Sequence, residues 1–390
     1  MFKMMKKAAK VAIALTVILG VGLQGDREAL AQNTDANAVV KQAQEDASPK
    51  ADKKVKKNKK QKKNDKTAKE TAPEVTEPPV VVEPPVVVEP PKPVTLTISF
   101  AGDCTLGEFT GMGYYGTVQE YYDKYGPDWF FANVKDIFSN DDFTYVNLEG
   151  PLTNIPQQVV KQFPIKGEVR NVNALVSGNI EVCNLANNHT LDCGQQGLDE
   201  TEQVLRDQGI AYCGGNTSSV ILEKKGIKVA FLGLHGWETS ESTQNEIRTA
   251  IAQAKEAGAQ LIIAQFHWGT ERRYEHEWDQ ELLAHLAVDC GADIIIGGHP
   301  HVLQDVEYYK GKLICYSMGN FSFGANTNPY DKDTVILQQT FVQTPEGFAY
   351  GNTNFIPCRI SSVNYVNDYK PTPYTEQADI DRVRWKLQLK

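Results

Sequence analysis

The sequence lacks a basic folded part, a CxxC pair and an apolar run long enough to span a membrane. Residues 1–93 contain 18 basic and 12 acidic side chains, whereas residues 94–390 contain 22 basic and 37 acidic ones, a net charge of −15. Nucleic-acid phosphates bind basic faces, so this charge argues against a nucleic-acid partner. An acidic domain also suits a cation-binding site, although solubility is the simpler explanation.

Cysteine is scarce and irregularly spaced. The chain has seven cysteines, and an odd number leaves at least one thiol without a partner in the same chain. Cys104, Cys183 and Cys193 lie beside the polar motifs described below. We interpret them mainly as small apolar packing residues, and a disulfide bond remains an open alternative.

The first 31 residues have the layout of an export signal. Four lysines within the first ten residues precede an apolar run at 11–23, and Ala-Leu-Ala at 29–31 is a small-x-small cleavage site. The apolar run is shorter than the roughly 20 residues that a spanning helix needs. We therefore expect export, with residues 1–31 either cleaved or retained as an N-terminal membrane anchor.

Residues 32–93 predict a disordered stalk. The run 53–66 is rich in lysine, and such a segment buries too little apolar surface to offset the entropy of ordering. Between Glu77 and Pro93 the unit Glu-Pro-Pro-Val-Val-Val occurs twice, and this density of proline favours an extended spacer. The stalk is interpreted as a solvated tether; attraction of its basic run to an anionic surface is the alternative.

Residues 94–360 predict an α/β domain, followed by a peripheral C-terminal tail at 361–390. Predicted strands lie at 94–100, 144–148, 180–183, 210–213, 261–266, 293–296 and 312–317, and predicted helices at 195–208, 245–257 and 279–290. Alternating strands and helices are typical of a layered α/β fold. A hairpin turning at 225–226 and late strands at 334–342 and 347–360 favour mixed sheets over a purely parallel one.

Polar side chains gather where five of these strands end. They are Asp103, Asn147 with Glu149, Asn188 with His189, His267, and His299 with His301. Strand ends at one edge of a sheet converge in layered α/β folds. A mixed set of carboxylate, amide and imidazole ligands suits Zn, Mn or Fe. Such an ion polarises a substrate oxygen and activates water.

Each of these residues also has a structural explanation. Asp103 fits a turn, Glu149 fits a solvated loop end, and His267 fits a hydrogen-bonded core imidazole. His299-Pro300-His301 follows two glycines in a chain with only seven histidines, and it is the strongest single ligand signal. We interpret His285, inside a predicted helix, as structural, and we assign His235 and His276 no role.

Six ordered motifs between Leu96 and Phe323 resemble the CapA-type bacterial capsule (poly-γ-glutamate) synthesis proteins. They are the segments 102–103, 147–153, 186–194, 267–271, 298–304 and 317–321. That family is similar to the calcineurin-like metallophosphoesterases. The resemblance implies two packed mixed β-sheets flanked by helices, a metallophosphatase-like four-layer sandwich, with the site at the edge where these loops meet.

The resemblance also implies roles for individual residues. Glu149 matches a bridging carboxylate; Asn188, His267 and His299 match the ligands of one divalent ion, and Asp103 and His301 those of a second. His189 matches a proton-donating histidine, with Asp192 as its orienting partner. The sequence departs from the wider superfamily at Asp103-Cys104-Thr105, where that pattern is Asp-x-His, and at Leu148-Glu149, where it is Gly-Asp.

The function implied is that of an exported metal-dependent hydrolase or transferase, with one or two divalent ions, acting on an anionic cell-surface polymer such as poly-γ-glutamate. Lys166, Glu271 and Asn320 are expected to contact the polymer. Two alternatives remain open. One is a non-catalytic polymer-binding or scaffold subunit of a membrane synthase complex, and the other is an extracellular phosphoesterase.

Overall fold

The structure is a computed structural model that describes residues 93–389. The predicted export signal at 1–31 and residues 32–92 of the predicted stalk lie outside the described residues. Within residues 93–389, no helix has the length and apolar character needed to cross a bilayer.

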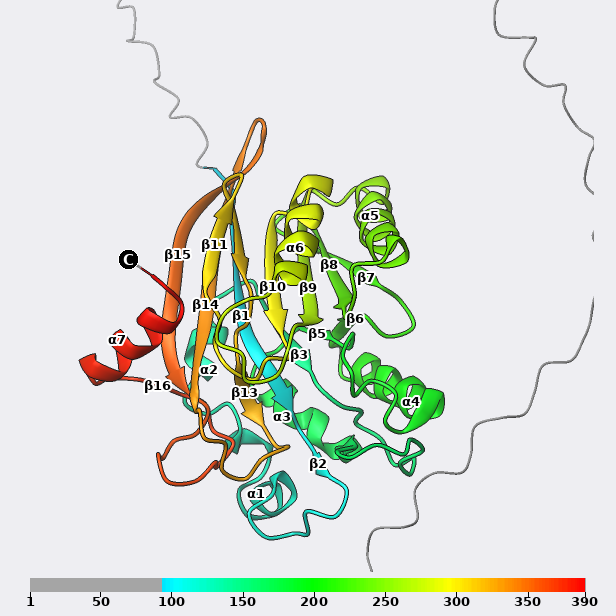
Figure 1. Cartoon of the computed structure of the whole chain (residues 1–390), viewed down its shortest axis with the longest axis vertical. Coiled ribbons are helices and arrows are strands. Elements are labelled where there is room, and N and C mark those ends of the chain that lie inside the picture. The colour runs from blue at the N-terminus through cyan, green and yellow to red at the C-terminus, as the bar shows by residue number, and fades with distance from the viewer. Residues whose placement is uncertain (1–92, 390) are drawn as a thin grey trace, which may run out of the picture. The chain divides into compact units, whose positions relative to one another are not determined.

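Two mixed β-sheets dominate the described part of the chain (Figure 1). The first has the strand order β16-β15-β14-β1-β3-β5-β6, with β13 paired to β1, and the second has the order β11-β12-β10-β9-β8-β7. The first contains β1 (Thr95–Thr105), β3 (Phe143–Leu148), β5 (Val182–Asn184), β6 (Ala211–Cys213), β13 (Asn320–Phe323), β14 (Asp333–Thr344), β15 (Gly347–Arg359) and β16 (Thr372–Pro373). The second contains β7 (Ser219–Lys224), β8 (Ile227–Gly236), β9 (Leu261–Trp268), β10 (Ile294–Gly298), β11 (Val306–Tyr309) and β12 (Lys312–Cys315). A small separate ribbon pairs β2 (Glu108–Phe109) with β4 (Ile165–Lys166).

Helices cover the outer faces of both sheets. They are α1 (Val118–Tyr125), α2 (Lys135–Phe138), α3 (Val172–Ser177), α4 (Gly194–Asp207), α5 (Glu241–Glu256) and α6 (Trp278–Cys290), whereas α7 (Gln377–Lys386) contributes to the cluster between the sheets. One apolar cluster packs the four helices α1–α4 against the first sheet, and another packs α5 and α6 against the second. A third cluster lies between the sheets, where Phe231 meets Tyr145 edge-to-face at 5.2 Å between ring centroids. The predicted four-layer sandwich is confirmed by these clusters.

The strands that carry the site are buried on both faces. All eight residues of β9, Leu-Ile-Ile-Ala-Gln-Phe-His-Trp, are buried, which is typical of a parallel strand between two helix-covered neighbours. β1 runs to Thr105, five residues beyond the predicted strand end, because it also pairs with β13. Asp103 therefore lies inside the strand and not after it.

Local signals in the sequence correspond to the observed turns and helix ends. The predicted hairpin is confirmed: β7 and β8 are joined at Lys225 and Gly226, whose φ angles of 55° and 77° suit a tight primed turn. Helix α6 ends at Cys290, and Gly291 follows with a left-handed φ of 109°, as a C-terminal cap requires.

The segment at 361–389 packs against the first sheet. β16 pairs with β15, and Val383 and Leu387 are fully buried in the cluster between the sheets. Arg382 and Lys386 of α7 both pair with Asp333 of β14, at 2.7 and 2.8 Å. The domain boundaries predicted from the sequence stay a prediction.

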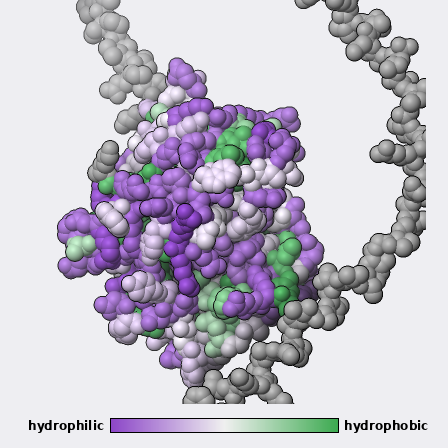
Figure 2. Space-filling view, in the orientation of Figure 1, coloured by the Kyte–Doolittle hydropathy of each residue, from purple (hydrophilic) through white to green (hydrophobic). Residues whose placement is uncertain are grey.

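All seven cysteines are free thiols, and six of them are buried, in agreement with their interpretation as packing residues. On the face shown in Figure 2, hydrophilic residues predominate and hydrophobic ones gather in a few separate areas.

Candidate functional site

Parallel strands of both sheets bring the candidate residues together at their carboxyl ends. Asp103 of β1 lies opposite Asn147 of β3, and Glu149 follows β3 by one residue. In the second sheet, His267 of β9 lies between Gly298 of β10 and His235 of β8. The expectation that these strand ends converge is therefore correct, although the residues come from two sheets.

The Glu149 carboxylate lies at the middle of the site. Its Oε1 is 3.6 Å from His267 Nε2, 3.8 Å from His189 Nε2 and 3.9 Å from His301 Nε2. The side chain is buried, and neither oxygen has a hydrogen-bond partner among the described residues. Burial raises the pKa of this carboxyl group, but the charge of His301 and the contacts with His267 and His189 outweigh burial and hold the pKa below its usual range.

The loop after β10 presents His299 and His301 in an unusual backbone conformation. Their φ angles are 94° and 56°, in the left-handed region that residues with a side chain rarely adopt. The His299 backbone N–H donates to Asp103 Oδ2 at 3.1 Å. A Cβ at Gly298 would lie 2.5 Å from Asp103 Oδ1, so glycine is required for this close approach.

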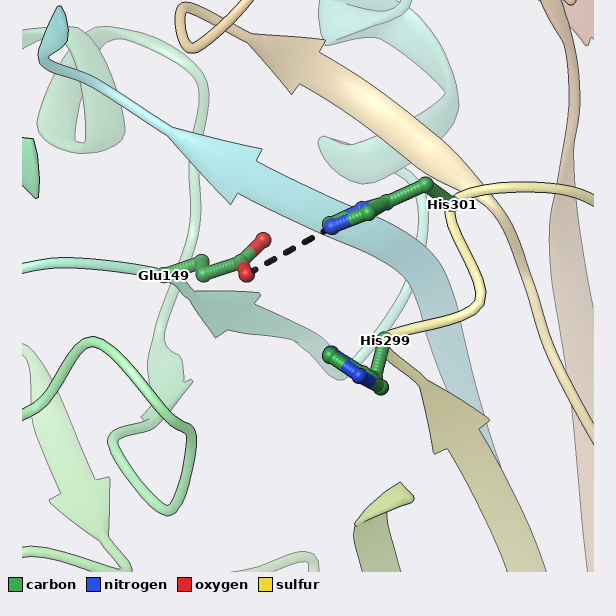
Figure 3. A group of neighbouring side chains, drawn as sticks. All are labelled: Glu149, His299 and His301. Carbon is green, nitrogen blue, oxygen red and sulfur yellow. Dashed lines mark ion pairs between the residues drawn. The ribbon is translucent and has the colours of Figure 1, made fainter. Parts of the chain in front are cut away.

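Both imidazoles of this loop point toward Glu149 (Figure 3), and potential ligand atoms of the three residues lie within 4.8 Å of one another. Burial, together with the charges of His267 and His301, lowers the pKa of His299 to about 3. Burial also lowers the pKa of His301, but the Glu149 charge and the hydrogen bond with Asp103 outweigh it and raise that pKa to about 9.

A chain of buried amides supports the site from behind. Asn147 Nδ2 lies 2.8 Å from Asp103 Oδ1 and 3.2 Å from His267 Nδ1, while its Oδ1 accepts from Asn184 and Asn187 at 3.0 and 3.2 Å. From the sequence, Asn147 was grouped with Glu149, whereas Asn184 was assigned no role. Its position at a strand end could have identified Asn184, because Asn184 is the last residue of β5 and Asn147 is the penultimate residue of β3.

Asn188 and His189 follow β5 and approach His267 and Glu149. Asn188 Oδ1 lies 3.1 Å from His267 Nε2. His189 Nδ1 donates to Asp192 Oδ2 at 2.7 Å, which leaves Nε2 directed toward Glu149. The pairing expected between His189 and Asp192 is present in the structure.

Lys161 also supports the site, although it was not predicted from the sequence. Its ammonium lies 2.6 Å from Asp192 Oδ1 and donates to the carbonyl oxygen of Asn188 at 2.9 Å. Asp192 is 2 % exposed, so Lys161 supplies the positive charge that this buried carboxylate otherwise lacks. No sequence signal marks Lys161, since it lies 28 residues before His189 in a loop.

The three residues expected to contact a polymer lie in different surroundings. Asn320 Oδ1 accepts from His301 Nδ1 at 2.9 Å, so it orients a candidate ligand. Glu271 is exposed, and its charge contributes to the raised pKa of His301. Lys166 Nζ donates to the Asn154 carbonyl oxygen at 3.4 Å, and within the described residues it forms no ion pair with Glu149.

The remaining histidines differ in their surroundings. His285 lies 3.0 Å from Glu307 and stacks on Tyr309, in keeping with its structural interpretation. His276 pairs with Asp305 at 2.9 Å. His235, by contrast, lies beside His267, and burial followed by the charge of His267 lowers its pKa to about 4.

The donor set fits a divalent metal ion. Buried atoms without partners among the described residues include both Glu149 oxygens and His299 Nδ1. His301 donates Nδ1–H to Asn320, which leaves Nε2 free in the manner of a metal-ligating imidazole. Two atoms bound to one zinc ion at tetrahedral geometry are about 3.4 Å apart, close to the 3.6–3.9 Å that separate Glu149 Oε1 from the imidazoles.

Comparison with known proteins shows the family of the chain. The model of the family described as "Bacterial capsule synthesis protein PGA_cap" matches residues 97–325, which contain all the candidate ligands. The chain belongs to the PGA_cap family. The CapA-type resemblance inferred from the motifs is confirmed.

Several curated proteins of this family are similar to the chain. The PGA biosynthesis protein CapA of Bacillus subtilis is 32% identical over 248 residues, covering 58% of this chain and 63% of the relative. The capsule biosynthesis protein CapA of Bacillus anthracis is 30% identical over 268 residues, covering 62% of this chain and 63% of the relative. The match thus spans less than two thirds of either relative's length.

Solved structures share less sequence identity with the chain than these relatives do. A novel phosphatase of Mycoplasma pneumoniae is 14% identical, with 68% of this chain and 94% of that chain covered and a TM-score of 0.45. A hypothetical protein of Thermus thermophilus is 13% identical, with 67% and 99% covered and a TM-score of 0.44. These scores are low, so the fold assignment rests on the sheets and layers described above.

Proposed function

We propose that this PGA_cap protein is an exported, metal-dependent hydrolase or transferase that acts on an anionic cell-surface polymer such as poly-γ-glutamate. The observation that carries the proposal is the buried Glu149 carboxylate, which has no hydrogen-bond partner among residues 93–389 and has three imidazole Nε2 atoms within 3.9 Å of Oε1. A buried charge without hydrogen bonds is costly unless a cation compensates it. The family names of the Bacillus relatives support the polymer, and the N-terminal signal supports export.

Glu149, His267, His299 and His301 would hold the ion, with Asn188 contributing its amide oxygen. A divalent ion in such a site polarises a substrate oxygen and lowers the pKa of water. Asp103 has a second task, because its two oxygens accept from Asn147 and from the His299 backbone. It would therefore position the loop of His299 and His301 even where it also binds an ion.

His189 would supply the proton for the leaving group. Its Nδ1–H is held by Asp192, so the proton for transfer would reside on Nε2, the atom that faces Glu149. Lys161 and the Ile165 backbone N–H, at 2.6 Å from Asp192 Oδ1 and Oδ2, keep that carboxylate in place. The His189 side chain is only 9 % exposed, so few alternative orientations compete with this one.

A non-catalytic accessory role is the second candidate. Two similar proteins of Mycobacterium tuberculosis, 28% identical over 178 residues, are described as probable polyglutamine synthesis accessory proteins. In this alternative the same residues bind an ion and the polymer, as part of a synthase complex, without breaking a bond.

Two measurements on the full-length protein separate these candidates. Metal content is determined after chelation and reloading with Mn, Zn or Fe, and chain length of poly-γ-glutamate is followed by size-exclusion chromatography beside a generic phosphodiester assay. We expect bound metal and shortened polymer, with His189→Ala losing about 10²- to 10⁴-fold in turnover while metal remains bound. His285→Ala serves as the control, since it removes an imidazole paired with Glu307 instead.

Full activity of His189→Ala would refute the proton-donor role. Bound metal and polymer without cleavage would support the accessory alternative, and cleavage of only the phosphodiester would make the protein a phosphoesterase.

A further inference from the structure

A cavity of about 290 Å³ lies beside the candidate metal centre. Asn188 and His235 belong to its lining, so the cavity reaches both a candidate ligand and the strand next to His267. Leu191, Gln195 and Asn216 are exposed to solvent, so the cavity is accessible from the surface. Its volume is at the small end of the range for ligand sites, which suits one segment of a longer substrate.

The lining is uncharged. None of the described residues that line the cavity is Asp, Glu, Lys or Arg, and four of them carry side-chain amides. Leu191 and Leu198 add apolar surface. The lining side chains therefore offer no carboxylate to an ammonium group, and no Lys or Arg to a phosphate or carboxylate group.

The outer wall, formed by Gln195 and Asn216, keeps its amide N–H groups on protein acceptors and is backed by negative charge. Gln195 Nε2 donates to Asp199 at 2.8 Å and to Asn216 Oδ1 at 2.8 Å, and Asn216 Nδ2 donates to Asp199 at 2.9 Å and Glu202 at 3.1 Å. The N–H groups of both amides are thus directed to protein acceptors. Asp199 and Glu202 behind this wall disfavour an incoming anion.

The inner wall carries a polar atom in need of a partner. His235 Nδ1 is buried and has no hydrogen-bond partner among residues 93–389. A substrate amide can hydrogen-bond to both walls, because its N–H donates to an acceptor and its C=O accepts from a donor. Carboxylate and phosphate groups only accept, and they would face the oxygens of the outer wall.

We propose that this cavity is a subsite for an uncharged amide segment of the substrate, placed beside Asn188. The inference rests on the proposed function and narrows it: the group that reaches the centre from this side belongs to an amide-linked chain and not to a phosphoester. The free carboxylates of a polymer such as poly-γ-glutamate would then lie outside the cavity.

Calorimetric binding to the full-length protein, with and without EDTA, tests this subsite. The probe is a γ-glutamyl amide capped at both ends whose α-carboxyl group is converted to a carboxamide, and its competitors are the same compound with a free carboxylate and inorganic phosphate. We expect the neutral probe to bind at least about tenfold more tightly than either competitor, since an anion leaves acceptors facing acceptors.

Two neighbouring glutamines of α4 give a matched pair of variants. Gln195 lines the cavity, whereas Gln196 is exposed and does not line it. Gln195→Trp is expected to fill the cavity and weaken binding of the neutral probe by about tenfold or more, and Gln196→Trp to leave it within about twofold.

Tighter binding of the carboxylate or of phosphate would overturn the proposal, as would equal effects of the two variants. Metal uptake is measured separately on the same samples. Probe binding without metal uptake would refute the proposed function but support the subsite. Metal uptake without an effect of Gln195→Trp on probe binding would refute the subsite but support the metal site.

Discussion

Removal of the Glu149 charge should abolish most of the stabilisation that a metal ion gives the protein. A ligand at 100 times its Kd stabilises the folded state by about 2.7 kcal/mol. The described domain has about 300 residues, and unfolding entropy is about 2.1 cal/mol/K per residue, so this energy raises Tm by about 4 °C.

Glu149→Gln keeps the shape of the side chain but removes the carboxylate that three imidazoles surround. Perturbing even the outer partners of a metal site weakens affinity by about 10- to 100-fold. At the same metal concentration, a 100-fold loss leaves about 0.4 kcal/mol of stabilisation, and the Tm shift falls below about 1 °C. Thermal scans of the chelated and metal-loaded proteins measure both shifts.

Asp305→Asn provides the control for this experiment. Asp305 is a buried carboxylate that faces His276 instead of the candidate centre, so its replacement lowers Tm without changing the metal-induced shift. A Glu149→Gln protein that keeps the full shift of about 4 °C would show that the ion binds elsewhere and would refute this assignment of the site.

Three further predictions concern groups around and away from the centre. Lys161→Met should lower turnover, because it disorders the Asp192 carboxylate that orients His189, and Lys161→Arg should restore turnover. A pH–rate profile of Lys161→Met that differs from wild type separates this loss of orientation from a loss of folding. The hydrogen bond to Asp305 raises the pKa of His276 in the folded protein. The stabilisation from this pair is therefore present below about pH 6.5 and is lost as pH rises through the folded pKa. Urea denaturation of His276→Gln at pH 6 and 9 should show a difference from wild type only at the lower pH. Asp333→Asn should destabilise the protein by about 1–3 kcal/mol, because a buried carboxylate loses its cationic partners on the last helix; an unchanged denaturation midpoint would contradict that docking.

The strand ends explain why most of the site was predictable from the sequence. Carboxyl ends of parallel strands share an edge, so His267 at the end of β9 and Glu149 just after β3 had to approach one another once the sheets packed. The H-x-H pair follows β10 for the same reason. These positions depend on short local patterns, and such patterns are readable from one sequence.

Partners that come from a loop or from an unmarked strand were not predictable in this way. Lys161 reaches Asp192 from a long connection whose path depends on packing and not on periodicity. His235 was left without a role because its neighbour in the sheet, His267, is 32 residues away and becomes adjacent only through β8–β9 pairing. Register between strands is a tertiary property, and a lone histidine does not specify it.

Asp103 and Glu149 looked equivalent as strand-end carboxylates, yet their neighbours give them different tasks. β1 continues past Asp103, so this side chain lies within the sheet and accepts from Asn147 and from the His299 backbone. Glu149 lies beyond β3, and its oxygens face imidazoles without a backbone donor from the described part of the chain. Replacement of Asp103 therefore reports first on the geometry of the His299 loop, whereas replacement of Glu149 reports directly on the charge that a cation would neutralise.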